Sequence, residues 1–167
     1  NSFDSFYAEK CGVKLNNQFI YIGPEKCNTI EKAMAVAREI ARKADKNLPQ
    51  LLALDSIAAY PAASDLGLEV KKMEEHKQAM AGVARAISFS VREITELLSK
   101  TKTVLICINQ MRDTLNTMGA KEEAPGGRAL KFFASIRLEL KKEGNALRQI
   151  DGKKYVEGIY SRARNIK

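Results

Sequence analysis

Apolar side chains recur at helical spacing in two stretches of the chain. The first stretch starts after Asn28, an Asn that can cap a helix and is followed three residues later by Glu31. Its apolar positions are Ile30, Met34, Ala37, Ala41 and Ala44. The second stretch covers about residues 78–100, with apolar positions at Val83, Ile87, Val91, Ile94 and Leu98. Both patterns predict amphipathic helices that bury one face.

Short apolar runs before, between and after these helices predict strands. Residues 19–22 are rich in strand-forming side chains and end at Gly23-Pro24. Residues 51–54 form an uninterrupted apolar run, which is typical of a strand buried on both faces, and residues 103–109 follow the second helix. Strands that alternate with helices predict a parallel sheet with helices packed against it and right-handed crossovers.

The carboxyl-terminal part follows a different pattern. Residues 111–127 lack an apolar period and contain Pro125-Gly126-Gly127, which predicts an unusually long functional loop. Residues 128–133 predict a helix, and apolar and polar side chains then alternate over residues 134–141. Asp151-Gly152 is a hairpin-turn signal. We therefore expect an antiparallel addition to the parallel sheet.

Composition narrows the class of protein. A chain of 167 residues with 45% hydrophobic content fits one globular domain, and no apolar run has the length of a membrane span. A net charge of +8 favours a polyanionic partner, although charge alone equally fits a basic surface that serves only solubility. The 3 cysteines, Cys11, Cys27 and Cys107, form no CxxC pair, which predicts reduced thiols in a cytoplasmic protein. The single His, His76, has no cysteine near it, so no zinc site is expected.

Two polar residues follow the predicted buried strands. Ligands of parallel sheets bind beyond the carboxyl ends of the strands, which places Asp55 and Gln110 on one functional edge. Asp55 followed by Ser56 suits the hydration shell of Mg²⁺ beside a nucleotide, although a strand-end Asp is also a common turn former. Gln110 can bind a terminal phosphate and couple it to the following loop, or it can be an ordinary amide at a strand end.

Several motifs resemble the RecA family of recombination ATPases. Residues 126–138, GGRALKFFASIRL, look like the RecA pattern GGxALKFxASxRL. Residues 54–59, LDSIAA, resemble the family's Walker B strand, and residues 108–112, INQMR, resemble its INQxR segment. Residues 7–13 are similar to the segment after the ATP-binding half. The resemblance covers nearly all of residues 1–167 and implies an α/β fold, a single partial RecA-like P-loop NTPase core.

The resemblance also implies a nucleotide site that uses ATP and Mg²⁺. Asp55, with Ser56, would be the Walker B carboxylate that organises Mg²⁺, and Gln110 would sense the γ-phosphate. Asp4 and Tyr7 match positions that line the adenine pocket. Residues that would reach a filament neighbour or its ATP are Arg162, Arg164, Lys131, Phe132 and Arg137.

The same resemblance implies two DNA-binding loops, at about residues 61–80 and 111–127. Met80 and Leu115 match apolar side chains that wedge between bases. Groups at the phosphate backbone would be Arg85, Ser88, Arg92, Arg112, Gly126 and Gly127. Met80 also fits core packing on a helix, and Arg92 equally fits a solvated helix face. The first loop is longer than in the family, so no roles are transferred across residues 64–77.

The expected function is ATP-dependent homologous recombination and DNA repair, including the SOS response. The protein would form helical filaments of its own copies on single-stranded DNA and exchange strands with double-stranded DNA. One departure is that no GxxxxGK[ST] occurs in the 167 residues, so the phosphate-cradling Walker A loop and its strand are missing. We expect a piece of a longer recombinase, inactive by itself as an ATPase; the alternative is a non-catalytic RecA-like module that coats DNA or modulates filaments.

Overall fold

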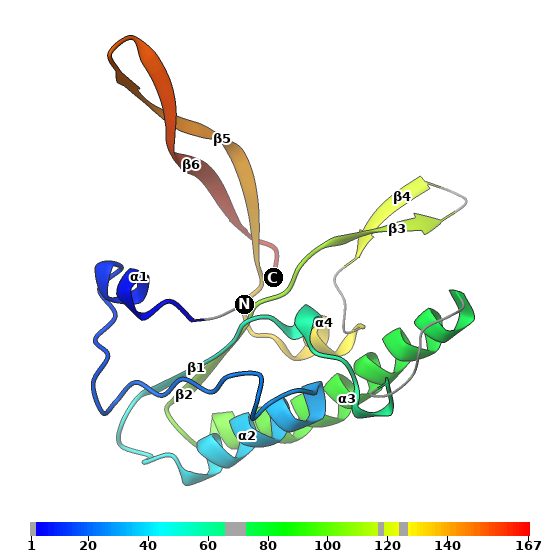
Figure 1. The fold of residues 1–167 in the computed structure, drawn as a ribbon. Helices are drawn as coiled ribbons and strands as arrows, with labels where there is room; N and C mark the ends of the chain where they lie inside the picture. Colours follow the sequence, from blue (N-terminus) through cyan, green and yellow to red (C-terminus); the bar gives the residue numbers. More distant parts are fainter. Residues whose placement is uncertain (1–2, 66–72, 117–118, 124–126) are drawn as a thin grey trace. The chain divides into compact units, whose positions relative to one another are not determined.

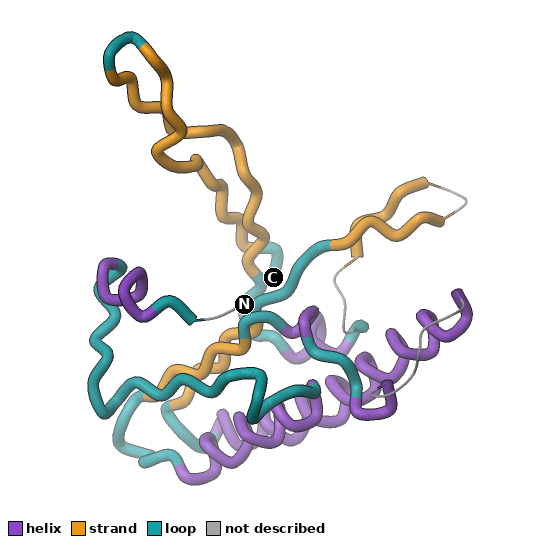
Figure 2. Tube along the Cα trace, viewed as in Figure 1, coloured by secondary structure: helices purple, strands orange, loops and turns teal. Residues whose placement is uncertain are grey.

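The computed structural model describes residues 3–65, 73–116, 119–123 and 127–167, and the chain divides into two compact units. The first unit is Asn1–Leu130 and the second is Lys131–Lys167. The sequence instead predicts a single partial core over residues 1–167. Figures 1 and 2 show helices and strands mixed in the first unit and a long two-stranded ribbon in the second. The coarse prediction of a mixed fold with a small parallel sheet is confirmed.

A parallel pair of strands is the centre of the first unit. β1 (Gln50–Leu54) and β2 (Thr103–Cys107) pair in register from Gln50 opposite Thr103 to Leu54 opposite Cys107. Both strands are apolar runs, and the connection between them contains a long helix, as a parallel crossover needs. The strands predicted over residues 51–54 and 103–109 are therefore confirmed, with the second one ending at Cys107.

Two helices pack against this pair (Figure 1). α2 (Ile30–Lys43) and α3 (Met73–Ser99) follow the apolar periods of the sequence. The core contains Ile30, Met34, Ala37, Ile57, Ala62, Ile87, Val91 and Ile94. The cap of α2 is Thr29 rather than the predicted Asn28, because the Thr29 hydroxyl accepts a hydrogen bond from the Lys32 amide at 3.3 Å.

The sheet differs from the prediction at its first strand. Residues 19–22 form no strand. Phe19 and Tyr21 instead stack on Phe3, with ring centroids 5.3 and 4.9 Å away, while Ile20 is exposed. An extended segment is a strand only when a neighbouring strand satisfies its backbone, and here aromatic packing holds the segment instead.

The prediction that the strand at residues 51–54 is buried on both faces is also wrong. Leu52, Leu54, Leu105 and Cys107 pack against the core. Alternate side chains on the opposite face remain exposed: Leu51, Val104 and Ile106. Successive residues of a strand point to opposite faces, so one covering layer of helices buries only every second side chain.

Both segments predicted as DNA-binding loops contain regular structure. After the short 3₁₀ turns Ile57–Ala59 and Ala63–Asp65, α3 begins at Met73, so residues 73–80 are helical. Residues 66–72 lie outside the described residues. Within 111–127, β3 (Arg112–Asn116) and β4 (Gly119–Glu123) form an antiparallel hairpin.

The second unit contains the end of α4 (Ala129–Phe133) and a hairpin of β5 (Leu138–Ile150) and β6 (Lys153–Asn165). The predicted turn at Asp151-Gly152 is confirmed, with φ of 50° and 76° at the two residues, as a type I′ turn requires. β5 and β6 form a separate two-stranded sheet, so the predicted addition to the parallel sheet is wrong. Among the described residues, no helix combines the length and the apolar character needed to cross a bilayer.

Candidate nucleotide edge and nucleic-acid interface

Backbone hydrogen bonds beyond the strand ends hold the carboxyl edge of the β1–β2 pair. The Ile108 amide donates to the Leu54 carbonyl at 3.0 Å, and the Ile57 amide donates to the Ile108 carbonyl at 2.9 Å. Asp55 lies between these two bonds with its side chain exposed, and Ser56, joined to it by a cis peptide bond, is buried. The edge therefore presents the Asp55 carboxylate from a fixed backbone.

Gln110 follows the second strand at the same edge. The Asn109 side-chain oxygen accepts a hydrogen bond from the Gln110 amide at 3.0 Å, which orders the backbone where β2 ends. The Gln110 side chain is exposed, and β3 begins two residues later at Arg112. The register of β1 and β2 thus brings Asp55 and Gln110 to one edge, as expected; their chemical roles stay predictions.

The candidate adenine contacts lie together on a short helix. α1 (Ser5–Lys10) is capped by Asp4, whose carboxylate accepts a hydrogen bond from the Tyr7 amide at 2.9 Å. The Tyr7 ring is exposed, and a side-chain hydrogen bond with Cys11 raises the pKa of its hydroxyl. Asp4 therefore orients the backbone that carries Tyr7, whatever else it binds.

Three candidate phosphate contacts occupy one face of α3. Arg85, Ser88 and Arg92 are spaced by three and four residues, and they line one shallow hollow of about 280 Å³ together with Phe89 and Glu93. Both arginines are exposed. Met80 belongs to the same helix, but its side chain lies outside the described part of the structure. The helix thus gathers cations on its solvent side while Ile87 and Val91 face the core.

A glycine turn brings the end of the second predicted loop against this helix. Gly127 has a φ of 71°, and a Cβ added there would lie 3.2 Å from the Cβ of Ala84, next to Arg85. Only glycine fits such a close approach without strain. Gly126 lies outside the described residues; Arg112 and Leu115 belong to β3, where only the backbone is described.

The two arginines predicted to serve a neighbour's ATP form ion pairs across the β5–β6 ribbon. Arg162 contacts the Glu143 carboxylate at 3.2 Å, and Arg164 contacts the Glu139 carboxylate at 3.0 Å. Both arginine side chains remain more than half exposed, at 62% and 64%. The carboxylates therefore position the two guanidinium groups on one side of the ribbon.

The candidate subunit-interface residues lie in the first segment of the second unit: Lys131, Phe132 and Arg137. The Lys167 ammonium donates to the carbonyls of Lys131 and Phe132, at 3.2 and 2.7 Å, and so satisfies the end of α4. The Phe132 ring is exposed. The Arg137 carbonyl accepts a hydrogen bond from the Ile166 amide at 2.9 Å. The first and last segments of this unit are thus tied together.

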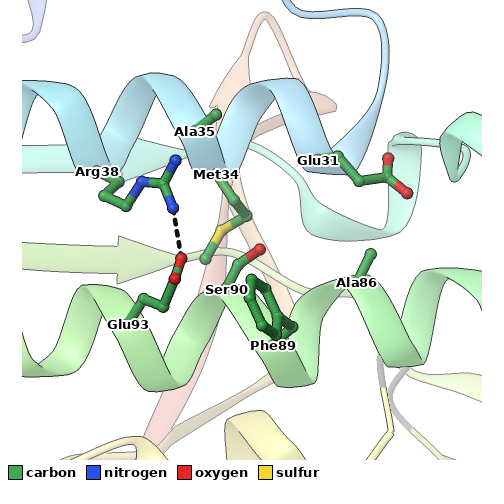
Figure 3. Close-up of a pocket in the computed structure, with 8 residues that line it drawn as sticks. All are labelled: Glu31, Met34, Ala35, Arg38, Ala86, Phe89, Ser90 and Glu93. Carbon is green, nitrogen blue, oxygen red and sulfur yellow. Dashed lines mark hydrogen bonds and ion pairs between the residues drawn. The ribbon is translucent and has the colours of Figure 1, made fainter.

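Two features of the basic helix face are absent from the sequence predictions. Phe89 is exposed between the arginines, and Arg38 of α2 pairs with Glu93 of α3 (Figure 3). The position of Phe89, four residues after Arg85 and three before Arg92, was a usable signal once the helix was predicted. No signal in the sequence indicated the Arg38–Glu93 pair, because the sequence does not show which helix faces touch.

The cysteines and Asp55 are the described residues that bear on cofactor binding. Cys11, Cys27 and Cys107 are free thiols. Asp55 offers one exposed carboxylate, which fits Mg²⁺ because this ion binds through one or two carboxylates, with phosphates and water as its other ligands. In the part of the chain that the structure describes, no group of three or more His, Cys, Asp or Glu residues could hold a metal ion.

Comparison with known proteins decides the family. The family model described as the RecA N-terminal domain matches residues 1–166. The chain belongs to the RecA family. Curated relatives named Protein RecA include those of Mycoplasmopsis pulmonis, 35% identical over 88% of this chain, and Mycoplasma mobile, 36% identical over 85%. The RecA of Thermus thermophilus is 31% identical over 89% of this chain.

The matched region is a part of each relative. The chain spans about 40% of the length of the RecA proteins of Mycoplasmopsis pulmonis, Mycoplasma mobile and Thermus thermophilus. Membership in the RecA family is therefore a statement about this region.

Proposed function

We propose that this chain is part of an ATP-dependent homologous recombination protein. The complete protein forms filaments on single-stranded DNA and catalyses homologous pairing and strand exchange with double-stranded DNA, and it acts in DNA repair in the cytoplasm. Membership in the RecA family supports this proposal, as do the two candidate sites, one at a sheet edge and one on a basic helix face.

The nucleotide side of the proposal assigns ATP and Mg²⁺ to the sheet edge. Asp55 would hold Mg²⁺ through water, and Ser56 keeps the backbone behind it buried. Mg²⁺ bound there would neutralise phosphate charge. Asp4 and Tyr7 would line the adenine pocket, with α1 holding the Tyr7 ring at its exposed position.

A single observation carries the proposal: Gln110 lies between the carboxyl edge of the β1–β2 pair and the first strand of the β3–β4 hairpin. Asn109 holds the Gln110 backbone, and Arg112 begins β3 two residues later. A phosphate bound by the Gln110 amide would pull on the backbone that leads into this hairpin. Nucleotide state and the position of Arg112 would then be coupled through a very short segment.

The DNA side of the proposal places phosphates on α3 and on the segments around residues 61–80 and 111–127. Arg85, Ser88 and Arg92 would hold the backbone of the strand, because cations and hydroxyl groups bind phosphates without reading sequence. The Gly127 turn against Ala84 would add backbone amides beside Arg85. Arg112 and Gly126 would hold further phosphates, while Met80 and Leu115 would wedge between bases.

The second unit would serve neighbouring copies in the filament. Arg162 and Arg164 would leave Glu143 and Glu139 for the phosphates of a neighbour's ATP. Both guanidinium groups are more than half exposed, so water weakens each ion pair and the exchange costs little. Phe132 offers an exposed ring for the same contact, and Lys131, which precedes it, and Arg137, which follows in the same segment, would add positive charge.

The alternative function is a non-catalytic RecA-like module that coats single-stranded DNA or modulates a filament. This alternative would bind DNA without a Walker A motif of its own. The coding sequence immediately upstream separates the two, because the catalytic proposal requires a Walker A motif there. A strand-exchange assay on the full-length protein is the functional test. Joint molecules that require ATP support the recombinase, and DNA binding without any nucleotide dependence contradicts it.

A further inference from the structure

Phe89 is an exposed aromatic residue in the middle of the basic face of α3. Its side chain is 69% exposed. With 3.6 residues per turn, position 89 lies on the side of the helix opposite the buried Ile87, Val91 and Ile94. Phe89 therefore contributes nothing to the packing of the core cluster. Exposure of a large apolar ring to water is unfavourable, and burial of the ring against a ligand would lower the free energy.

The immediate neighbours of Phe89 are cations. Arg85 precedes it by four residues and Arg92 follows it by three, and helical neighbours at these spacings lie about 5–6 Å apart at their Cβ atoms. Phe89 lines the hollow of about 280 Å³ with Arg85, Ser88 and Arg92. It also lines a second hollow, of about 260 Å³, at the junction with α2 (Figure 3).

The combination of a ring with two flanking cations fits one ligand class well. Single-stranded nucleic acids are bound by positive side chains that follow the phosphates and by aromatic rings on which bases stack. Stacking tolerates any sequence because every base has a flat face. We propose that Phe89 is a base-stacking contact for single-stranded DNA. This inference rests on the proposed DNA-binding function and adds a residue and a type of contact to it.

Charge favours DNA over an apolar protein partner at this place. A protein that covered Phe89 would also have to cover or pair the guanidinium groups of Arg85 and Arg92, which are both exposed. The one carboxylate in the hollow, Glu93, is already bound by Arg38. The face around the ring therefore offers positive charge to a ligand, as a phosphate chain requires.

Tryptophan fluorescence tests the stacking directly. The 167 residues contain no Trp, so Phe89→Trp introduces the one Trp of this region at the proposed contact, and the parent protein titrated in parallel gives any background signal. The variant is titrated with oligo(dT) and with an abasic oligomer of the same length, which has the phosphates without the bases. We expect quenching by oligo(dT) and little change with the abasic oligomer. Equal signals from the two oligomers, or no signal while oligo(dT) is bound, would overturn the inference.

Affinity measurements supply a second, independent readout. Phe89→Ala and Phe89→Leu should weaken oligo(dT) binding about five- to a hundredfold, and Phe89→Tyr should retain it. The dependence of affinity on salt should not change, because no phosphate contact is lost. Phe6→Ala is the matched control, since Phe6 is also exposed beside a cation, with the Lys10 ammonium 4.3 Å from its ring centroid. This control should bind like the parent.

The outcomes separate this inference from the function on which it rests. Parent binding to oligo(dT) that Phe89→Ala leaves unchanged contradicts the inference and leaves the DNA-binding function standing. A Phe89→Ala variant that changes only the sedimentation of the free protein points to a second copy as the occupant and also contradicts it. A parent that binds no single-stranded DNA at all contradicts the proposed function, and the inference falls with it.

Discussion

The Arg38 guanidinium on α2 binds the Glu93 carboxylate on α3, beside the basic face of that helix (Figure 3). The two side chains are 41% and 39% exposed, so water screens the pair and its contribution to stability is small. Its position matters more. Glu93 lines the same hollow as Arg85 and Arg92, and Arg38 compensates the one carboxylate that would repel a phosphate there.

A double-mutant cycle tests this role. Arg38→Met and Glu93→Gln should each lower the free energy of unfolding slightly, with a coupling of at most about 1 kcal/mol. Arg38→Met should also weaken single-stranded DNA binding, because Glu93 then lacks its counter-charge. Combining the two substitutions should restore binding, as measured by fluorescence anisotropy. A double variant that binds as weakly as Arg38→Met would show that Arg38 itself holds DNA and would refute the compensating role.

The proposed phosphate contacts on α3 predict a specific salt dependence. Arg85→Ala and Arg92→Ala should weaken binding to single-stranded DNA and lower the slope of log affinity against log salt by about 0.7 each, since each removes one counterion-releasing contact. Arg42→Ala removes another exposed arginine, from α2, where it pairs with Glu39, and should leave the slope unchanged. Equal slopes in all three variants would show that Arg85 and Arg92 do not contact the phosphates.

Cys107 predicts a loss of stability at high pH. Burial raises the pKa of the Cys107 thiol to about 11, from an ordinary value of 9.0. Because the folded protein holds this proton more tightly than the unfolded chain, the contribution is complete below about pH 9 and is lost as pH rises toward 11. Chemical denaturation between pH 8 and 11 measures the effect. The free energy of unfolding of Cys107→Ala should decline less steeply with pH than that of the parent. An identical decline would show that folding does not remove the Cys107 thiol from water.

The apolar periods of the sequence were sufficient to predict the helical part of the core. The positions of Ile30, Met34 and Ala37 on α2, and of Ile87, Val91 and Ile94 on α3, follow from helical spacing alone, and all of them are buried. The uninterrupted run of residues 51–54 likewise predicted β1. Local chemistry dominates in these segments, because a helix or strand with such a pattern has one stable way to bury its apolar side chains.

Other features depend on distant residues and therefore escaped prediction. Residues 19–22 have strand chemistry but meet the Phe3 ring rather than another strand. The β3–β4 hairpin consists of the polar sequences RDTLN and GAKEE, in which no alternation marks a buried face. At the candidate sites, the order of Asp55 and Gln110 along the chain predicted their shared edge. The pairing of Arg38 with Glu93 required knowledge of how α2 lies against α3.

We propose that Gln110 couples the candidate nucleotide edge to the β3–β4 hairpin, and DNA-stimulated ATP hydrolysis tests this coupling most directly. The measurement compares the full-length protein with its Gln110→Ala variant, and uses Gln149→Ala on the exposed end of β5 as the control. We predict that Gln110→Ala binds ATP almost as tightly as the parent but loses the rise in hydrolysis on adding single-stranded DNA, while Gln149→Ala keeps it. Equal stimulation of parent and Gln110→Ala would contradict this coupling.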